Sequence, residues 1–367
     1  MSAGAPIVLL GPRGERPFDA PEIERELRAM WKTTSNDHGP LYRAAMANLV
    51  VPVEGPLRER LGPVLAEVAR RHPSRLIEIE PGAAEAGDPE RLLARATALC
   101  HVRPGGGMVC SEQIRIEWSA RSAALLPSAV QALLVGDLPT VLLAIEPGPT
   151  TPWLAALGRI ADLVIRDSAI ERDPRAMARF WDAETGNGRA TRHDLAWARL
   201  APWRSLLAEA FDRPEAGRAI RSLQEVAIFH GGAAPPAGAW LLAGWLAARL
   251  GWTPRSAGPG HVRFDAPTRP VTVAFLPEED EPGAVIRRVR VRAGDPTPLD
   301  VSIEHRGHDP VAHETFEAPV ATTRAVTFAY RDLAASIVGE IHRHEPNRAF
   351  ADAARAAEEL IALWPSA

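Results

Sequence analysis

The chain of 367 residues has very little lysine, no strong excess of charge of either sign and no long apolar run. Lys32 is the only lysine beside many arginines, which we interpret as nucleotide-composition bias. The formal net charge is -4 and combines charges of both signs, so nucleic acid is not an expected partner. No apolar stretch approaches the roughly 20 residues that span a bilayer, so we expect no membrane partner. A short apolar run, Ile7 to Leu10, has no basic segment ahead of it and does not resemble a signal peptide.

Cysteine is also scarce. Cys100 and Cys110 cannot provide a disulfide scaffold for a chain of this length, and they suit a reducing compartment. They flank a turn and could face each other across a hairpin. A redox switch is one interpretation, and a pair of buried small hydrophobic residues is the commoner one. We therefore expect a cytoplasmic protein.

The length favours two domains. Residues 1–18 lack periodicity and are predicted to be a flexible arm. Helical and strand patterns then alternate, beginning with the helix PEIERELRAMW, which Asp19 can cap. The segment LPTVLLAIEPG has no polar alternation, which is typical of a strand buried on both faces of a parallel sheet. We predict an α/β N-terminal domain over residues 19–190, with a mixed or mostly parallel sheet.

The pattern changes after the linker candidate AETGNGRATRHD. Two apolar helices rich in tryptophan follow, DLAWARLAPWRSLLAEAFD and AWLLAGWLAARLGW. Strand-like runs come next, with short hairpin-like spacings: PVTVAFL, AVIRRVRVRAG, LDVSIEHRG, HETFEA and AVTFAY. An amphipathic helix closes the chain. Residues 191–367 are therefore predicted to form an α+β C-terminal domain with a largely antiparallel sheet.

Motifs for catalysis and for cofactors are weak. The run Gly105-Gly106-Gly107 is followed by Met108 and not by Lys-Ser/Thr, so a tight turn is the better interpretation than a phosphate-binding loop. No G-x-S-x-G elbow occurs. We predict no catalytic residue and no cofactor.

Histidines gather in the stretch EHRGHDPVAHE, which contains His305, His308, Asp309 and His313. Their spacing fits no standard zinc template. Solvated histidines in a turn are the expected arrangement, and we predict no metal site.

Three arginines share one face of a predicted strand: Arg288, Arg290 and Arg292. One interpretation is an exposed sheet face with cross-strand Arg–Glu pairs. The other is an anion-binding or partner-docking patch, because three aligned arginines exceed what one glutamate can neutralise. The sequence leaves both open.

Tryptophan and arginine also meet in the first C-terminal helix. An ideal helix places Trp197, Leu200, Arg204, Leu207 and Phe211 on one stripe. An arginine inside an apolar stripe must find an acid or carbonyl partner, or else face another molecule. Trp and Arg are favoured anchors of protein interfaces, although core packing accounts for most tryptophans.

Several stretches taken together resemble the OpcA family, also called glucose-6-phosphate dehydrogenase assembly proteins. They are IERELRAMW, NLVVPV, RHPSRLIEIE, GDLPTVLL, HDLAWARLAPWRSLL and LLAGWLAARLGW. The pattern D-L-A-W-x-R-x-x-x-W-R is the most specific of them. The resemblance runs from about residue 20 to the end and is thinner in the final third.

The resemblance implies a non-catalytic assembly factor or allosteric activator of glucose-6-phosphate dehydrogenase, in the oxidative pentose phosphate pathway, that binds and stabilises the active oligomer. The hypothetical interface residues are Trp197, Arg199, Trp203, Arg204, Arg75, Arg288, Arg290 and Arg292. The signature helix could equally be a buried joint between the domains. Two alternatives are a sensor or enzyme that binds a sugar phosphate on the arginine-rich strand face, and a scaffold without effect on turnover.

Overall fold

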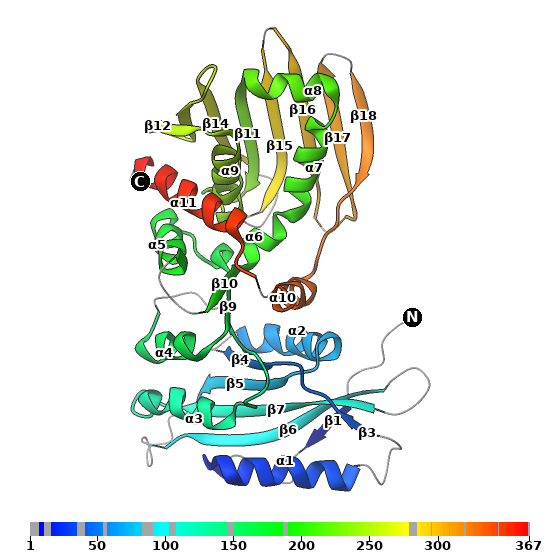
Figure 1. The fold of residues 1–367 in the computed structure, drawn as a ribbon, viewed down its shortest axis with the longest axis vertical. Coiled ribbons are helices and arrows are strands. Elements are labelled where there is room, and N and C mark those ends of the chain that lie inside the picture. Colours follow the sequence, from blue (N-terminus) through cyan, green and yellow to red (C-terminus); the bar gives the residue numbers. More distant parts are fainter. Residues whose placement is uncertain are drawn as a thin grey trace. The chain divides into compact units, whose positions relative to one another are not determined.

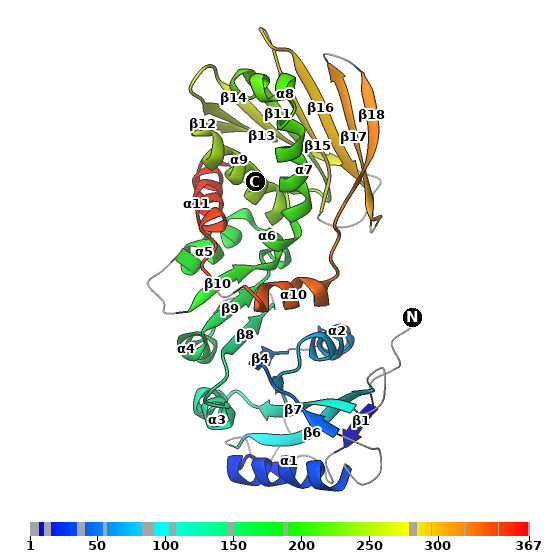
Figure 2. The same cartoon turned by 45° about the vertical axis from the view of Figure 1, so that its right-hand side comes forward.

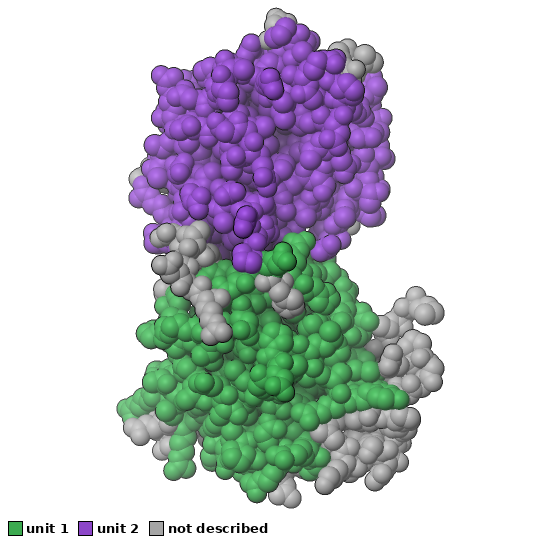
Figure 3. Space-filling view, in the orientation of Figure 1, with its two compact units in different colours: residues 1–167, 188–193, 332–345 green, residues 168–187, 194–331, 346–367 purple. Residues whose placement is uncertain are grey.

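The chain divides into two compact units, which Figure 3 shows in two colours. Unit 1 comprises residues 1–167, 188–193 and 332–345, and unit 2 comprises residues 168–187, 194–331 and 346–367. The structure is a computed structural model, and it describes residues 7–10, 16–34, 41–53, 57–82, 91–102, 108–145, 150–185, 190–278, 285–294, 296–307, 309–318, 321–343 and 345–365. The predicted turn at Gly105-Gly106-Gly107 lies outside these residues.

The described strands of unit 1 join in one sheet, in the order β1-β6-β7-β5-β4-β8-β9-β10, with β2 beside β6 and β3 beside β7. Its strands are β1 (Ile7–Leu10), β2 (Arg16–Pro17), β3 (Leu41–Arg43), β4 (Asn48–Pro52), β5 (Arg75–Pro81), β6 (Leu93–Val102), β7 (Met108–Trp118), β8 (Thr140–Ala144), β9 (Leu163–Arg166) and β10 (Thr191–Asp194). The adjacent strands β7, β5, β4, β8 and β9 run parallel to one another, whereas β6 runs antiparallel to β7. The predicted α/β architecture with a mostly parallel sheet is confirmed.

Helices cover both faces of this sheet, which explains why β4 and β8 are buried at every position. The helices are α1 (Ala20–Thr34), α2 (Leu57–Arg71), α3 (Leu126–Leu133), α4 (Pro152–Ile160) and α10 (Leu333–Ile341), with a short 3-10 turn, η1 (Ala123–Leu125). Figures 1 and 2 show α1 and α2 on opposite faces. Asp19 caps α1 as predicted, since its Oδ1 accepts the Glu22 amide at 3.2 Å. Helix α10, although late in the chain, packs against α2.

Cys100 and Cys110 lie directly opposite each other in the β6–β7 pairing and are joined by a disulfide. Both residues are fully buried. The predicted position across a hairpin is confirmed, and the two sulfurs are bonded to each other where separate buried thiols were the commoner expectation.

The sheet of unit 2 follows the order β12-β13-β14-β11-β15-β16-β17-β18. Its strands are β11 (Leu223–Gly231), β12 (Thr253–Gly258), β13 (His261–Asp265), β14 (Val271–Glu278), β15 (Ile286–Ala293), β16 (Leu299–His305), β17 (Val311–Ala318) and β18 (Thr322–Thr327). The described pairs are antiparallel except β11 with β14. The predicted α+β class with a largely antiparallel sheet is confirmed.

Helices of unit 2 cover one face of its sheet, as α7 and α9 show in Figures 1 and 2. The helices are α5 (Pro174–Thr185), α6 (Leu195–Arg199), α7 (Ala201–Phe211), α8 (Pro214–Ala219), α9 (Ala237–Leu250) and α11 (Arg348–Leu363), with short 3-10 turns η2 (Ser168–Ile170) and η3 (Ile220–Ser222). Val289 and Val291 of β15 join the core beneath them. Helices α9 and α11 pack closely at Gly244, where a Cβ atom would lie 2.2 Å from the Ala353 carbonyl oxygen. Among the residues described, no helix is both long and apolar enough to cross a membrane.

Candidate functional site

The motif that starts at Asp194 forms two short helices, α6 and α7, that meet at Leu200. Asp194 is buried, and its carboxylate accepts hydrogen bonds from backbone amides and from a tryptophan. The donors are the amides of Ala196 (2.7 Å) and Ser168 (3.2 Å) and the indole nitrogen of Trp181 (3.1 Å). A buried carboxylate needs such donors, so this residue determines where α6 begins and how it is anchored in unit 2.

Trp197 of α6 and Arg204 of α7 are in direct contact and hold the two helices in place. The Trp197 side chain is buried and its ring lies 5.8 Å from that of Phe350 in α11. The Arg204 guanidinium lies 3.5 Å from the centre of the Trp197 ring, and its Nη1 donates to the Trp197 carbonyl at 2.8 Å. The arginine in the apolar stripe thus has the carbonyl partner that its position requires, and a cation–π contact as well.

Arg199 and Trp203 of the same motif line a pocket of about 510 Å³ within unit 2. Trp203 is buried and forms one wall together with Phe328, at 5.2 Å between ring centres. His305 stacks on Phe328 at 3.6 Å, and its Nε2 lies 2.7 Å from the Asp309 carbonyl oxygen. The wall of the pocket is therefore aromatic and closely packed.

Three arginines line the pocket. Arg199, Arg287 and Arg331 contribute guanidinium groups, and none of the described lining residues is aspartate or glutamate. Val285 and Tyr330 also line it and are unusually exposed for large side chains, at 48% and 42%. The arrangement combines apolar surface with a few cationic groups, which is typical of a site that binds an amphipathic, acidic group.

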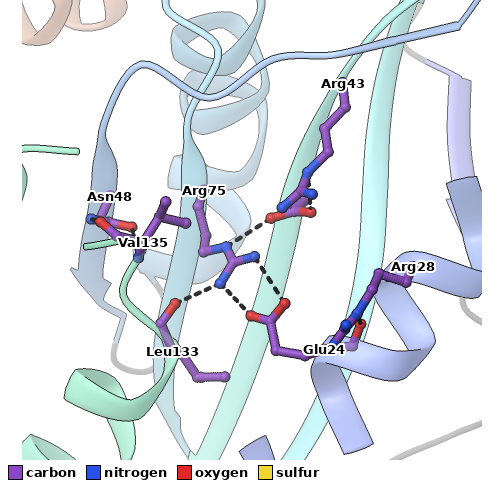
Figure 4. A network of polar contacts seen from close by, with 8 residues as sticks. Glu24, Arg28, Arg43, Asn48, Arg75, Leu133 and Val135 are labelled. Carbon is purple, nitrogen blue, oxygen red and sulfur yellow. Dashed lines mark hydrogen bonds and ion pairs between the residues drawn. The ribbon is translucent and has the colours of Figure 1, made fainter. Parts of the chain in front are cut away.

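Arg75 lies inside unit 1, with 3% of its side chain exposed (Figure 4). Its Nε donates to Glu112 at 2.7 Å, and its Nη1 donates to Glu24 at 2.5 Å and to the Leu133 carbonyl at 2.7 Å. Arg43 also pairs with Glu112, at 2.8 Å. Burial alone would lower the pKa of Arg75, but its hydrogen bonds and charge interactions with the two glutamates outweigh that effect and raise it. This guanidinium joins α1, β5, β7 and the end of α3.

Arg288, Arg290 and Arg292 lie on the face of the unit 2 sheet that is opposite the buried valines. Each of the three arginines pairs with carboxylates on other strands of the sheet. Arg288 pairs with Glu278 (3.1 Å), and Arg292 pairs with Glu225. Arg290 pairs with Asp300 (2.6 Å) and Glu317 (2.9 Å). The hydrogen bond with Asp300 raises the pKa of Arg290. The side chains are about one third to one half exposed, so this face is balanced in charge and consists of cross-strand pairs.

The histidine stretch is not gathered around one point. His305 belongs to the pocket wall, His313 lies on β17 opposite Glu304, and His308 lies outside the described residues. Within the described part of the chain, no group of three His, Cys, Asp or Glu side chains could hold a metal ion.

No pattern in the sequence marks the exposed residues that line the pocket. Val285, Tyr330 and Arg331 stand in loops beside β15 and α10, and no local pattern distinguishes them from solvated loop residues. Asp194 was detectable, because an aspartate directly before an apolar helical run is a typical N-cap.

Two protein-family models match the chain in order. The model described as the glucose-6-phosphate dehydrogenase subunit N-terminal domain matches residues 65–180, and that of the C-terminal domain matches residues 190–354. Together they cover most of both units.

Curated relatives named as the OxPP cycle protein OpcA are similar over part of the chain. The one from Nostoc punctiforme is 34% identical over 195 residues, which are 52% of this chain and 40% of that protein. The one from Synechocystis is 28% identical over 276 residues, which are 72% of this chain and 56% of that protein. The chain thus spans about half the length of the curated relatives it matches.

A solved NAD binding oxidoreductase from Klebsiella pneumoniae aligns with this chain at 9% identity and a TM-score of 0.49, over 86% of this chain and 96% of that chain. Similarity at this level supports no conclusion about activity. The two domain matches, in the right order and with the OpcA relatives, show that this chain belongs to the OpcA family.

Proposed function

We propose that this chain is a non-catalytic subunit that binds glucose-6-phosphate dehydrogenase and stabilises its active oligomer, in the oxidative pentose phosphate pathway of the cytoplasm. The observation that carries the proposal is the ordered match to both domains of a glucose-6-phosphate dehydrogenase subunit. The charged lining and exposed rim of the unit 2 pocket are consistent with a surface that meets another protein.

The mechanism under this proposal is differential binding. A subunit that binds the active oligomer more tightly than the inactive form shifts the population by no more than that difference in affinity. A shift from 1:99 to 99:1 needs an affinity ratio of about 10⁴, or about 5.5 kcal/mol. A large interface with several anchor residues can supply such a difference.

The eight hypothetical interface residues take different parts in this proposal. Arg199 and Trp203 reach the partner through the pocket, while Trp197 and Arg204 keep the two signature helices in place. Arg75 acts indirectly by holding unit 1 together. The paired arginines of β15 offer a charge-balanced surface that a partner can contact only by sharing or displacing existing ion pairs.

The test is a substrate saturation curve of glucose-6-phosphate dehydrogenase from the same genome, with and without equimolar purified chain. We expect the chain to change the curve and to have no turnover of its own. Complex formation with an unchanged curve would make the chain a scaffold. Saturable binding of glucose 6-phosphate by the chain alone, without the dehydrogenase, would favour a sugar-phosphate sensor or enzyme.

A further inference from the structure

Part of the lining of the unit 2 pocket is apolar and exposed. Val285 and Tyr330 line the pocket and are 48% and 42% exposed, and the buried Trp203 packs against Phe328 in its aromatic wall. Large apolar side chains gathered at a concave surface are typical of binding sites, whereas single exposed ones are ordinary. This part of the pocket suits a bulky apolar group.

Cationic groups stand beside that apolar surface. Arg331 is exposed, and Arg199 and Arg287 line the pocket with it. None of the described lining residues is a carboxylate, so an anionic group placed beside the exposed Arg331 would meet a guanidinium and no lining carboxylate. A guanidinium matches the planar geometry of a carboxylate with two parallel hydrogen bonds.

The described lining offers few side chains that could accept hydrogen bonds from the hydroxyls of a sugar. Tyr330 has a hydroxyl and His305 has ring nitrogens, but the described lining residues include no Ser, Thr, Asn, Gln, Asp or Glu. His305 already lies 2.7 Å from the Asp309 carbonyl oxygen and is stacked on Phe328. Apolar surface with arginine is instead the composition of protein-interface anchors.

We propose that this pocket receives a segment of glucose-6-phosphate dehydrogenase in which a bulky apolar side chain stands next to a carboxylate. The apolar side chain packs against Tyr330 and the aromatic wall, and the carboxylate pairs with Arg331. The inference rests on the proposed function and adds the surface through which the partner is recognised. It also assigns a role to half of the signature motif, since Arg199 and Trp203 shape the pocket while Trp197 and Arg204 hold the helices.

The experiment uses bio-layer interferometry to measure the dissociation constant between the full chain and the dehydrogenase. It compares the wild-type chain with three variants. Arg331→Glu reverses an exposed charge of the pocket, and Tyr330→Ser removes its exposed apolar group. Arg255→Glu is the matched control, because Arg255 is an exposed arginine of the same unit that pairs with Asp265 on β13 and does not line the pocket. Thermal melting verifies that all variants fold.

We expect each pocket variant to weaken binding roughly tenfold or more, as loss of an interface anchor does, and the control to change it less than twofold. The Arg331→Glu variant should also bind with less salt dependence. If wild type binds and all three variants bind equally well, the pocket proposal is wrong while the proposed function stands. If wild type does not bind, both fail. If glucose 6-phosphate binds the isolated chain and Arg331→Glu abolishes that binding, the pocket belongs to a small anion.

Discussion

Replacing Arg75 with methionine tests whether this residue is structural. The change keeps an unbranched apolar stem and removes the guanidinium that joins Glu24, Glu112 and the Leu133 carbonyl (Figure 4). Glu112 is buried, with 1% of its side chain exposed, so it would lose its buried guanidinium partner, while its ion pair with the more exposed Arg43 would remain. We expect unit 1 to be destabilised.

The size of the loss in unfolding free energy depends on the surroundings of Glu24 and Glu112. Removing one partner of a buried ion pair costs about 3–5 kcal/mol, because an uncompensated charge remains. We expect the lower end of this energy range for two reasons. Glu24 is 29% exposed and can be hydrated, and Arg43 still pairs with Glu112 at 2.8 Å. A loss of about 3 kcal/mol corresponds to a fall of about 1.5 M in the urea midpoint, for a slope near 2 kcal/mol per molar.

The assay is hydrogen exchange of β5 and β7 amides in urea, which reports on unit 1 alone. Arg70→Met is the matched control, because Arg70 pairs with Glu67 at the surface of the same unit. We expect Arg70→Met to lower the unfolding free energy of unit 1 by no more than about 1 kcal/mol. Adding Glu112→Gln to the Arg75 variant should recover part of the lost stability, since it removes the buried carboxylate charge that Arg75 helps to neutralise. An Arg75→Met protein that is as stable as wild type but no longer binds the dehydrogenase would refute the structural role.

Three further predictions concern packing, titration and the disulfide. Gly244→Ala places a methyl group against the Ala353 carbonyl and should destabilise unit 2 by about 2 kcal/mol or more in urea unfolding, whereas Gly238→Ala in the same helix meets no such contact and should be neutral or stabilising. The hydrogen bond from Arg70 holds the pKa of Glu67 at about 2, below its ordinary 4.5, so the stabilising effect of this carboxylate is present above pH 4.5 and is lost as the pH falls through 2; carbon-13 NMR titration should show the low midpoint, and Arg70→Met should raise it. Reducing the disulfide between β6 and β7 should cost unit 1 about 2–3 kcal/mol, measured in urea with and without a thiol reductant, and an unchanged midpoint would contradict this.

The sequence predicted the elements whose periodicity is strong. The continuous apolar run of β8 indicated a parallel sheet. The alternation in β15 placed its arginines on one face, and the structure shows Val289 and Val291 buried on the other. The sequence also predicted one long signature helix, which the structure shows as α6 and α7. Pro202 in the first turn of α7 explains the division, because proline has no amide hydrogen and suits a helix start.

Contacts between residues that lie far apart in the chain could not be predicted from the sequence. Arg75 meets Glu24 and Glu112, which lie 51 and 37 residues away, so no local pattern could show that it is buried. The β15 arginines pair with carboxylates on β11, β14, β16 and β17, which spacing along the chain could not show. Strand β11 lies at the centre of the unit 2 sheet and was not predicted. Its pairing with β14 and β15 depends on the tertiary arrangement.

We propose that this molecule recognises glucose-6-phosphate dehydrogenase and shifts its assembly. The most direct measurement is the mass distribution of the dehydrogenase at nanomolar concentration, recorded by mass photometry while the chain is titrated in. We predict that free lower-order forms disappear in favour of a larger complex that contains the chain. A distribution that stays the same at every ratio, with the chain remaining as a separate species, would contradict the account.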